Sequence, residues 1–116
     1  MTDITFYHNP RCSKSRETLA LVDNDKNTVD IIKYLETPPS VDTIKTLISQ
    51  LGFDSARQLM RTKETLYKEL SLASEHDESA LVTILQANPK LIERPIVVAN
   101  GKAAIGRPPE SVLAIL

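Results

Sequence analysis

The chain has 116 residues, of which 41% are hydrophobic and 25% charged, and its formal net charge at pH 7 is -1. This size fits one domain with one core. A net charge of -1 does not favour a nucleic-acid partner, because nucleic-acid binders usually carry a basic surface. No run approaches the ~20 apolar residues that span a bilayer, and the N-terminus lacks the pattern of a signal peptide. We therefore expect a cytoplasmic, monomeric, single-domain protein that binds neither nucleic acid nor membrane.

The first third of the chain predicts a β-α-β unit. The segment DITFYH, residues 3–8, alternates with Ile4 and Phe6 on one face, which is typical of a strand. Residues 13–24 are rich in helix formers. Residues 28–35, TVDIIKYL, are rich in β-branched side chains and favour a second strand. The two strands should be parallel and joined by a right-handed crossover.

A helical segment follows at about residues 40–88, where the hydrophobic period changes. Ser40 is a candidate N-cap and Gly52 a candidate C-terminal stop for its first helix. Further helical patterns cover residues 55–60, 64–70 and 78–88. We interpret this segment as an insertion in a domain that spans residues 1–116, because it is too small to bury much core alone.

The C-terminal part returns to strand chemistry. Asn100-Gly101 lies between two β-capable runs, which is the strongest short hairpin signal. Pro108-Pro109 then precedes a predicted final helix, ESVLAIL, since proline is tolerated in the first turn of a helix. The order β-α-β, helical insertion, β-β-α is that of an α/β, thioredoxin-like fold with a mixed four-stranded sheet.

Cys12, the single cysteine, is the first candidate for chemistry. A free cysteine is often a small buried hydrophobe, but this one lies between a predicted strand and a predicted helix. The unpaired N–H groups and dipole at a helix N-terminus favour thiolate, and such sites lower a cysteine pKa from about 8.5 to roughly 3.5–7.5. Lys14 and Arg16 would act in the same direction. The position therefore favours a reactive thiolate over a structural cysteine.

The spacing after Cys12 restricts the mechanism. In the run CSKS, Ser15 occupies the place where a dithiol oxidoreductase has its second cysteine. A redox cycle would therefore take its resolving thiol from outside, most simply from glutathione or a glutaredoxin. A tyrosine-phosphatase-like loop would have arginine six positions after the cysteine, where this chain has Thr18.

Two arginines and one histidine complete the candidates that the residues alone suggest. Arg94 and Arg107 each precede a proline, which holds their backbone extended. Arginine forks bind tetrahedral oxyanions, although single arginines at strand ends are commonly surface residues. His8 could orient the loop, act as a base, or be a structural hydrogen-bonding group. With His76 far away in the sequence, no metal-ligand spacing is present, and we expect no metal site.

Four motifs together resemble the glutaredoxin-dependent arsenate reductase (ArsC) family, in particular its short YfgD-like bacterial branch. They are YHNPRCSKSRETL, LMRTKE, ERPIVV and GRPPE, and they cover almost the whole chain in order. The resemblance implies that Cys12 attacks arsenate to form a thiol-arsenate adduct, which glutathione reduces before glutaredoxin clears the mixed disulfide and arsenite leaves. The sequence does not report the isomer of the Arg94–Pro95 peptide bond, although a cis proline beside the nucleophile is expected in a thioredoxin-like fold.

The resemblance assigns roles to individual residues. It makes Arg61, Arg94 and Arg107 the oxyanion-binding arginines, His8 the histidine near the nucleophile, and Ser15 a serine that helps hold the thiolate. No bound cofactor is implied, and glutathione is a co-substrate.

One departure is Ser13-Lys14, where well-characterised arsenate reducers of this family tend to have glycine and threonine. Ser13 adds bulk where the backbone must approach the anion, and Lys14 adds charge. Two alternatives therefore remain open. One is a glutathione-linked thiol oxidoreductase acting on another substrate. The other is a regulator that binds RNA polymerase, similar to the Spx proteins, which typically carry C-x-x-C.

Overall fold

The computed structural model describes residues 2–116, which divide into two compact units. The first, called here the sheet unit, comprises residues 2–37 and 94–116. The second, called here the helical unit, comprises residues 38–93. The assignment of all 116 residues to one domain with an insertion at about 40–88 stays a prediction.

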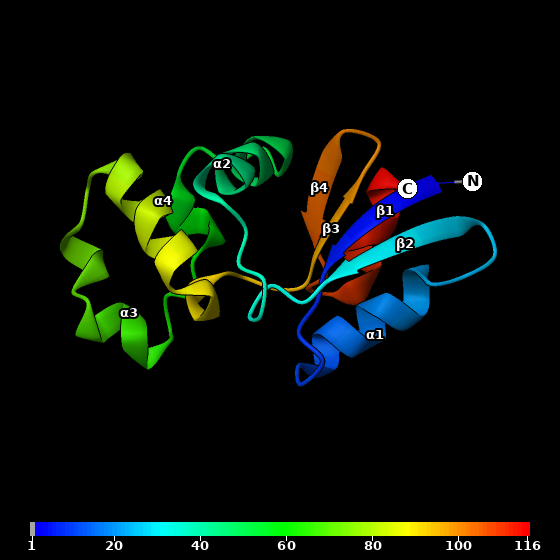
Figure 1. The fold of residues 1–116 in the computed structure, drawn as a ribbon, viewed down its shortest axis with the longest axis horizontal. Helices are drawn as coiled ribbons and strands as arrows, with labels where there is room; N and C mark the ends of the chain where they lie inside the picture. Colours follow the sequence, from blue (N-terminus) through cyan, green and yellow to red (C-terminus); the bar gives the residue numbers. More distant parts are fainter. Residues whose placement is uncertain (1) are drawn as a thin grey trace. The chain divides into compact units, whose positions relative to one another are not determined.

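The sheet unit contains a four-stranded mixed sheet in the order β2-β1-β3-β4 (Figure 1). β1 pairs in parallel with β2, and antiparallel pairing joins β1 to β3 and β3 to β4. The strands are β1 (Thr2–Tyr7), β2 (Asn27–Ile32), β3 (Ile96–Ala99) and β4 (Lys102–Ile105). The order and directions confirm the predicted thioredoxin-like α/β fold.

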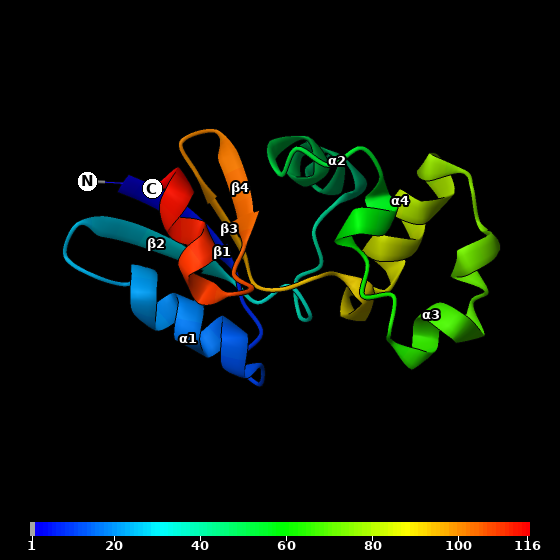
Figure 2. The ribbon, with the colours of Figure 1, turned by 180° about the vertical axis from the view of Figure 1, so that it is seen from behind.

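The core of the sheet unit lies on one face of the sheet, which α1 (Ser13–Val22) and the 3-10 helix η4 (Pro109–Ile115) cover (Figure 2). Alternation along β1 turns Ile4 and Phe6 toward this core, as the sequence predicts. Val22 of α1 and Val112 of η4 are fully buried against them. The predicted final helix therefore exists, but as a 3-10 helix.

A two-residue turn joins β3 to β4. Both of its residues, Asn100 and Gly101, have positive φ, at 55° and 76°. This combination belongs to the type I′ turn, whose twist matches that of the strands, and asparagine followed by glycine adopts it most readily. The predicted hairpin is confirmed, with Ala99 and Lys102 paired directly beside the turn.

The helical unit begins with the predicted helix α2 (Val41–Gln50). Ser40 caps it by accepting from the N–H of Thr43 at 3.1 Å, and Gly52, at φ 73°, ends it with a hydrogen bond from its N–H to the Ser49 carbonyl. The other elements are η1 (Ala56–Leu59), α3 (Thr65–Glu69), η2 (Leu72–Ser74), α4 (Glu78–Ala87) and η3 (Pro89–Leu91).

The helical unit buries large apolar side chains of its own, including Ile44, Leu59, Leu81 and Leu85. In α4, Leu81, Val82 and Leu85 are buried, and Ile84 is half-buried. Across residues 2–116, no helix has both the length and the apolar character needed to cross a membrane.

Candidate active site

Cys12 lies between the end of β1 and the first residue of α1. It is the N-cap residue of the helix, with extended backbone at φ -93° and ψ 123°. Its N–H donates to the Asn9 carbonyl at 3.0 Å, and its own carbonyl accepts from the N–H of Arg16 at 3.0 Å. The helix start that the sequence predicts is thus confirmed, and the sulfur is attached where backbone N–H groups lack intrahelical acceptors.

The surroundings of the Cys12 sulfur favour thiolate. Burial of Cys12, which is 9% exposed, acts to raise the thiol pKa. The backbone N–H groups of Ser15 and Lys14 donate to the sulfur, and the charges of Arg94 and Arg107 add to their effect. Together these groups outweigh the burial, so the pKa of Cys12 lies below its ordinary value.

Arg107 provides the direct contact between a guanidinium and the sulfur. Its Nη2 donates to Cys12 Sγ at 3.8 Å, and its Nε donates to the Arg94 carbonyl at 2.9 Å. Two short segments around the prolines therefore bring both arginines to the cysteine. The peptide bonds before Pro95 and Pro108 are both cis, and the first of these is the one expected for a thioredoxin-like fold.

Arg94 has donors that are not used within the described chain. Its Nε and Nη1 are buried, and neither has a hydrogen-bond partner among residues 2–116. Buried donors on a charged group normally have acceptors, because leaving them unsatisfied is costly. An oxyanion next to the Cys12 sulfur would supply such acceptors in a charge-assisted geometry.

His8 and Ser15 form a buried pair that ties β1 to α1. His8 Nδ1 lies 2.7 Å from Ser15 Oγ, which also accepts from the N–H of Asn9 at 3.0 Å. Burial lowers the pKa of His8, and the charges of Lys33 and Arg16 lower it further. A neutral imidazole hydrogen-bonded in this way is suited to hold the loop before Cys12. Among residues 2–116 no group of three or more His, Cys, Asp or Glu is arranged to hold a metal ion.

Ser15, the serine predicted to hold the thiolate, contacts the Cys12 sulfur through its backbone N–H and not through its hydroxyl. The Ser15 N–H donates to Cys12, whereas its hydroxyl is bonded to His8 and Asn9. Arg61 belongs to the helical unit, where its Nη1 pairs with Glu64 at 2.9 Å. Because the structure does not position the two units relative to each other, the role of Arg61 stays a prediction.

Gly106 is a residue that the sequence analysis did not select. Its N–H donates to the Pro95 carbonyl at 3.0 Å. A Cβ at this position would overlap Thr18 Oγ1 and would lie 2.9 Å from both Thr18 Cγ2 and Pro95 Cγ. The absent side chain therefore allows the end of β4 to approach α1 and Arg107 to lie beside Cys12. The glycine directly before the arginine in GRPPE was the only available signal.

Comparisons with known proteins place the chain in a family. The ArsC family model matches residues 7–115. The protein YfgD of Escherichia coli (strain K12) is 58% identical over 97% of this chain and 96% of its own length. An arsenate reductase of Neisseria meningitidis (serogroup B) is 48% identical over the whole of both chains. The solved structure of an arsenate reductase from Vibrio cholerae is 56% identical, with a TM-score of 0.95, and the match covers 99% of this chain and 98% of that one. On this family match and these identities, the chain belongs to the ArsC family.

Proposed function

We propose that this protein is an arsenate reductase in which Cys12 is the nucleophile and glutathione and glutaredoxin supply the electrons. The observation that carries the proposal is the cluster around the sulfur, where Arg107 lies 3.8 Å away and Arg94 has buried, unpartnered donors. The relatives named arsenate reductase, at 43–48% identity for curated sequences and 56% for one solved structure, support the choice of oxyanion.

The first step joins sulfur to arsenic. The Cys12 thiolate attacks As(V), an S–As bond forms, and one arsenate oxygen leaves as water after protonation. Arg94 and Arg107 offset the repulsion between thiolate and anion, and they stabilise the charge on the arsenate oxygens. The backbone donors at Ser15 and Lys14 hold the sulfur before the attack.

The second step reduces arsenic. The glutathione thiolate attacks Cys12 Sγ, an S–S bond forms, and the S–As bond breaks with its electron pair on arsenic, which leaves as As(III) arsenite. The chain has one cysteine, so no internal thiol can open the resulting mixed disulfide. A glutaredoxin thiolate attacks the glutathione sulfur and releases Cys12 as thiolate. This route requires a compartment in which glutathione is kept reduced, such as the cytoplasm.

The Ser13-Lys14 departure leaves the donors of the site intact. Both side chains are exposed, and Lys14 Nζ lies 3.5 Å from Glu17 Oε2. What Lys14 provides to the sulfur is its backbone N–H, which does not depend on its side chain. The geometry at Cys12 therefore gives no reason to prefer another substrate.

The test is arsenite formation by the purified protein with arsenate, glutathione, glutaredoxin, glutathione reductase and NADPH. We expect turnover in the wild type and none in Cys12→Ser, with Lys102→Gln as a control at the far end of β4. Mass spectrometry should detect the glutathione adduct on Cys12. If no arsenite forms while Cys12 is still reversibly glutathionylated, the arsenate assignment fails and a thiol oxidoreductase acting on another substrate replaces it.

A further inference from the structure

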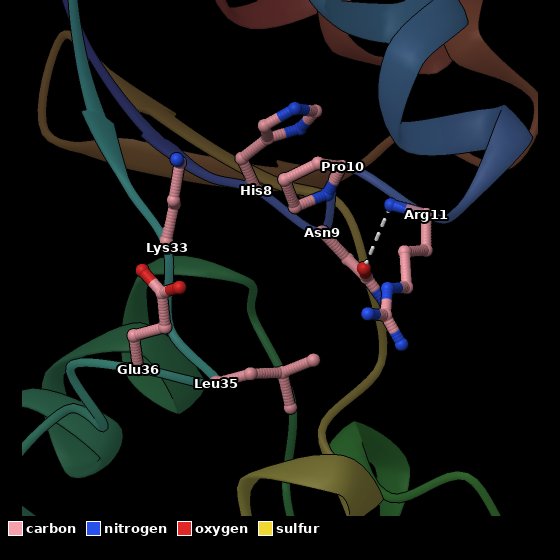
Figure 3. Close-up of a pocket in the computed structure, with 7 residues that line it drawn as sticks. All are labelled: His8, Asn9, Pro10, Arg11, Lys33, Leu35 and Glu36. Carbon is pink, nitrogen blue, oxygen red and sulfur yellow. Dashed lines mark hydrogen bonds between the residues drawn. The ribbon is translucent and has the colours of Figure 1, made fainter.

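A cavity of about 260 Å³ lies beside the loop that precedes Cys12 (Figure 3). The loop 8–11, which follows β1, forms one wall, and residues that follow β2 form the other. Because β1 and β2 are parallel neighbours, their carboxyl ends bring the two walls together at one sheet edge, where α/β proteins commonly bind ligands. The lining residues are His8, Asn9, Pro10, Arg11, Lys33, Leu35 and Glu36.

Three charged side chains of this cavity are not used within the described chain. Arg11, Lys33 and Glu36 make no side-chain hydrogen bond or ion pair with any of residues 2–116, although Lys33 acts on His8 through its charge. Figure 3 shows Lys33 and Glu36 on the wall after β2 and Arg11 on the loop opposite, with Leu35 on the same segment as the first two. The cavity thus offers two positive groups, one negative group and an apolar surface.

The cavity wall and the nucleophile belong to the same short segment. Arg11 directly precedes Cys12, and the Cys12 N–H donates to the carbonyl of Asn9, another lining residue. A molecule held in this cavity therefore contacts the loop that leads to Cys12, the residue that must react with an external thiol. This proximity connects the cavity to the reductant.

We propose that this cavity binds the peptide of glutathione and presents its thiol to Cys12, an inference that rests on the proposed function. Glutathione carries an ammonium and a carboxylate at its γ-glutamyl end and a carboxylate at its glycyl end, with the thiol between them. Lys33 and Glu36 complement the first end, and Arg11 complements the second. The volume lies just below the range of about 300–1,000 Å³ for drug-sized ligands, which suits a small, partly exposed tripeptide.

Binding is tested without chemistry by titrating S-methylglutathione, whose sulfur is blocked, into the full-length, ¹⁵N-labelled protein. We expect amide shifts at residues 8–11 and 33–36. Arg11→Gln and Glu36→Gln should each weaken binding about two- to fivefold, the effect of one partly exposed charge contact. Lys102→Gln is the matched control outside the cavity. Shifts confined to other parts of the protein, or equal affinity in all variants, would overturn the proposal.

Kinetics supply the second measurement. In the arsenite assay, kcat/KM with glutathione is divided by kcat/KM with 2-mercaptoethanol, a thiol that has no charged ends. We expect this ratio to fall about two- to fivefold in Arg11→Gln and Glu36→Gln, and an unchanged ratio contradicts the proposal. If S-methylglutathione binds at the cavity but arsenite never forms, only the proposed function fails. If glutathione supports arsenite formation without binding there, only the cavity assignment fails.

Discussion

Gly106→Ala tests whether the close approach of β4 to α1 builds the site. The added Cβ would overlap Thr18 Oγ1 and lie 2.9 Å from Pro95 Cγ. Neither neighbour can yield easily, because the Thr18 hydroxyl donates to the Lys14 carbonyl at 2.7 Å and the proline ring is rigid. Overpacking of this kind costs about 1–3 kcal/mol, and with contacts on two sides we expect about 2 kcal/mol.

The assay is urea and thermal unfolding, both followed by circular dichroism, together with the pH dependence of Cys12 alkylation. A loss of about 2 kcal/mol corresponds to a fall in Tm of roughly 6–12 °C for a chain of this size. Because Arg107 follows Gly106 directly, displacement of this segment should move its guanidinium from the sulfur and raise the pKa of Cys12. Both effects should appear in the same variant.

A double-mutant cycle with Thr18→Ala separates crowding from other causes. Thr18→Ala removes two of the three close atoms, so Gly106→Ala should cost at least ~1 kcal/mol less in that background. Gly101→Ala is the matched control. It has open space but a φ of 76°, so its cost comes from the backbone and Thr18→Ala should not relieve it. The reasoning is refuted if Gly106→Ala stays within about 0.5 kcal/mol of wild type, or if Thr18→Ala gives no relief.

Two further predictions concern protonation. Arg107→Gln should raise the pKa of Cys12, measured by iodoacetamide reactivity against pH, whereas Lys102→Gln, at the start of β4, should not; equal profiles in both variants would exclude a direct effect of Arg107. The pKa of His8 is lowered, so the folded protein binds fewer protons at this site than the unfolded chain just below the ordinary value of about 6.5. The contribution of His8 to stability is therefore full above pH ~6.5, and it is lost as the pH falls from there toward the lower pKa of the folded state. His8→Gln should therefore reduce the slope of unfolding free energy against pH between these two pKa values.

The sequence predicts well those parts of the fold that are determined by residues adjacent in the chain. Asn100-Gly101 specifies its turn because few other residues tolerate positive φ at both positions. Ser40 and Gly52 delimit α2 because capping groups act within one turn of the helix. The final helix was predicted from Pro108-Pro109 and an apolar run, but those signals do not distinguish an α-helix from the 3-10 helix that forms.

The parts of the candidate site that the sequence could not predict depend on contacts distant in sequence. Nothing local indicates that Gly106 meets Thr18, or that Arg94 has buried donors without partners. The cavity lined by Arg11, Lys33 and Glu36 exists because two parallel strands end side by side, which no single motif encodes. Residue type and position predict Cys12 as the nucleophile, whereas the pairing of distant segments determines what surrounds it.

The surroundings of the Cys12 sulfur also bear on Ser13-Lys14, the two positions where the resemblance to the family led us to expect glycine and threonine. If side chains at these positions held the thiolate, their replacement would alter the chemistry. The donors to the sulfur are instead the backbone N–H groups of Lys14 and Ser15, which every residue except proline provides. Burial of Cys12 and the charges of Arg94 and Arg107 come from other segments. The two exposed side chains can therefore vary while the thiolate site is kept, and their effect should fall on what approaches Cys12 from outside.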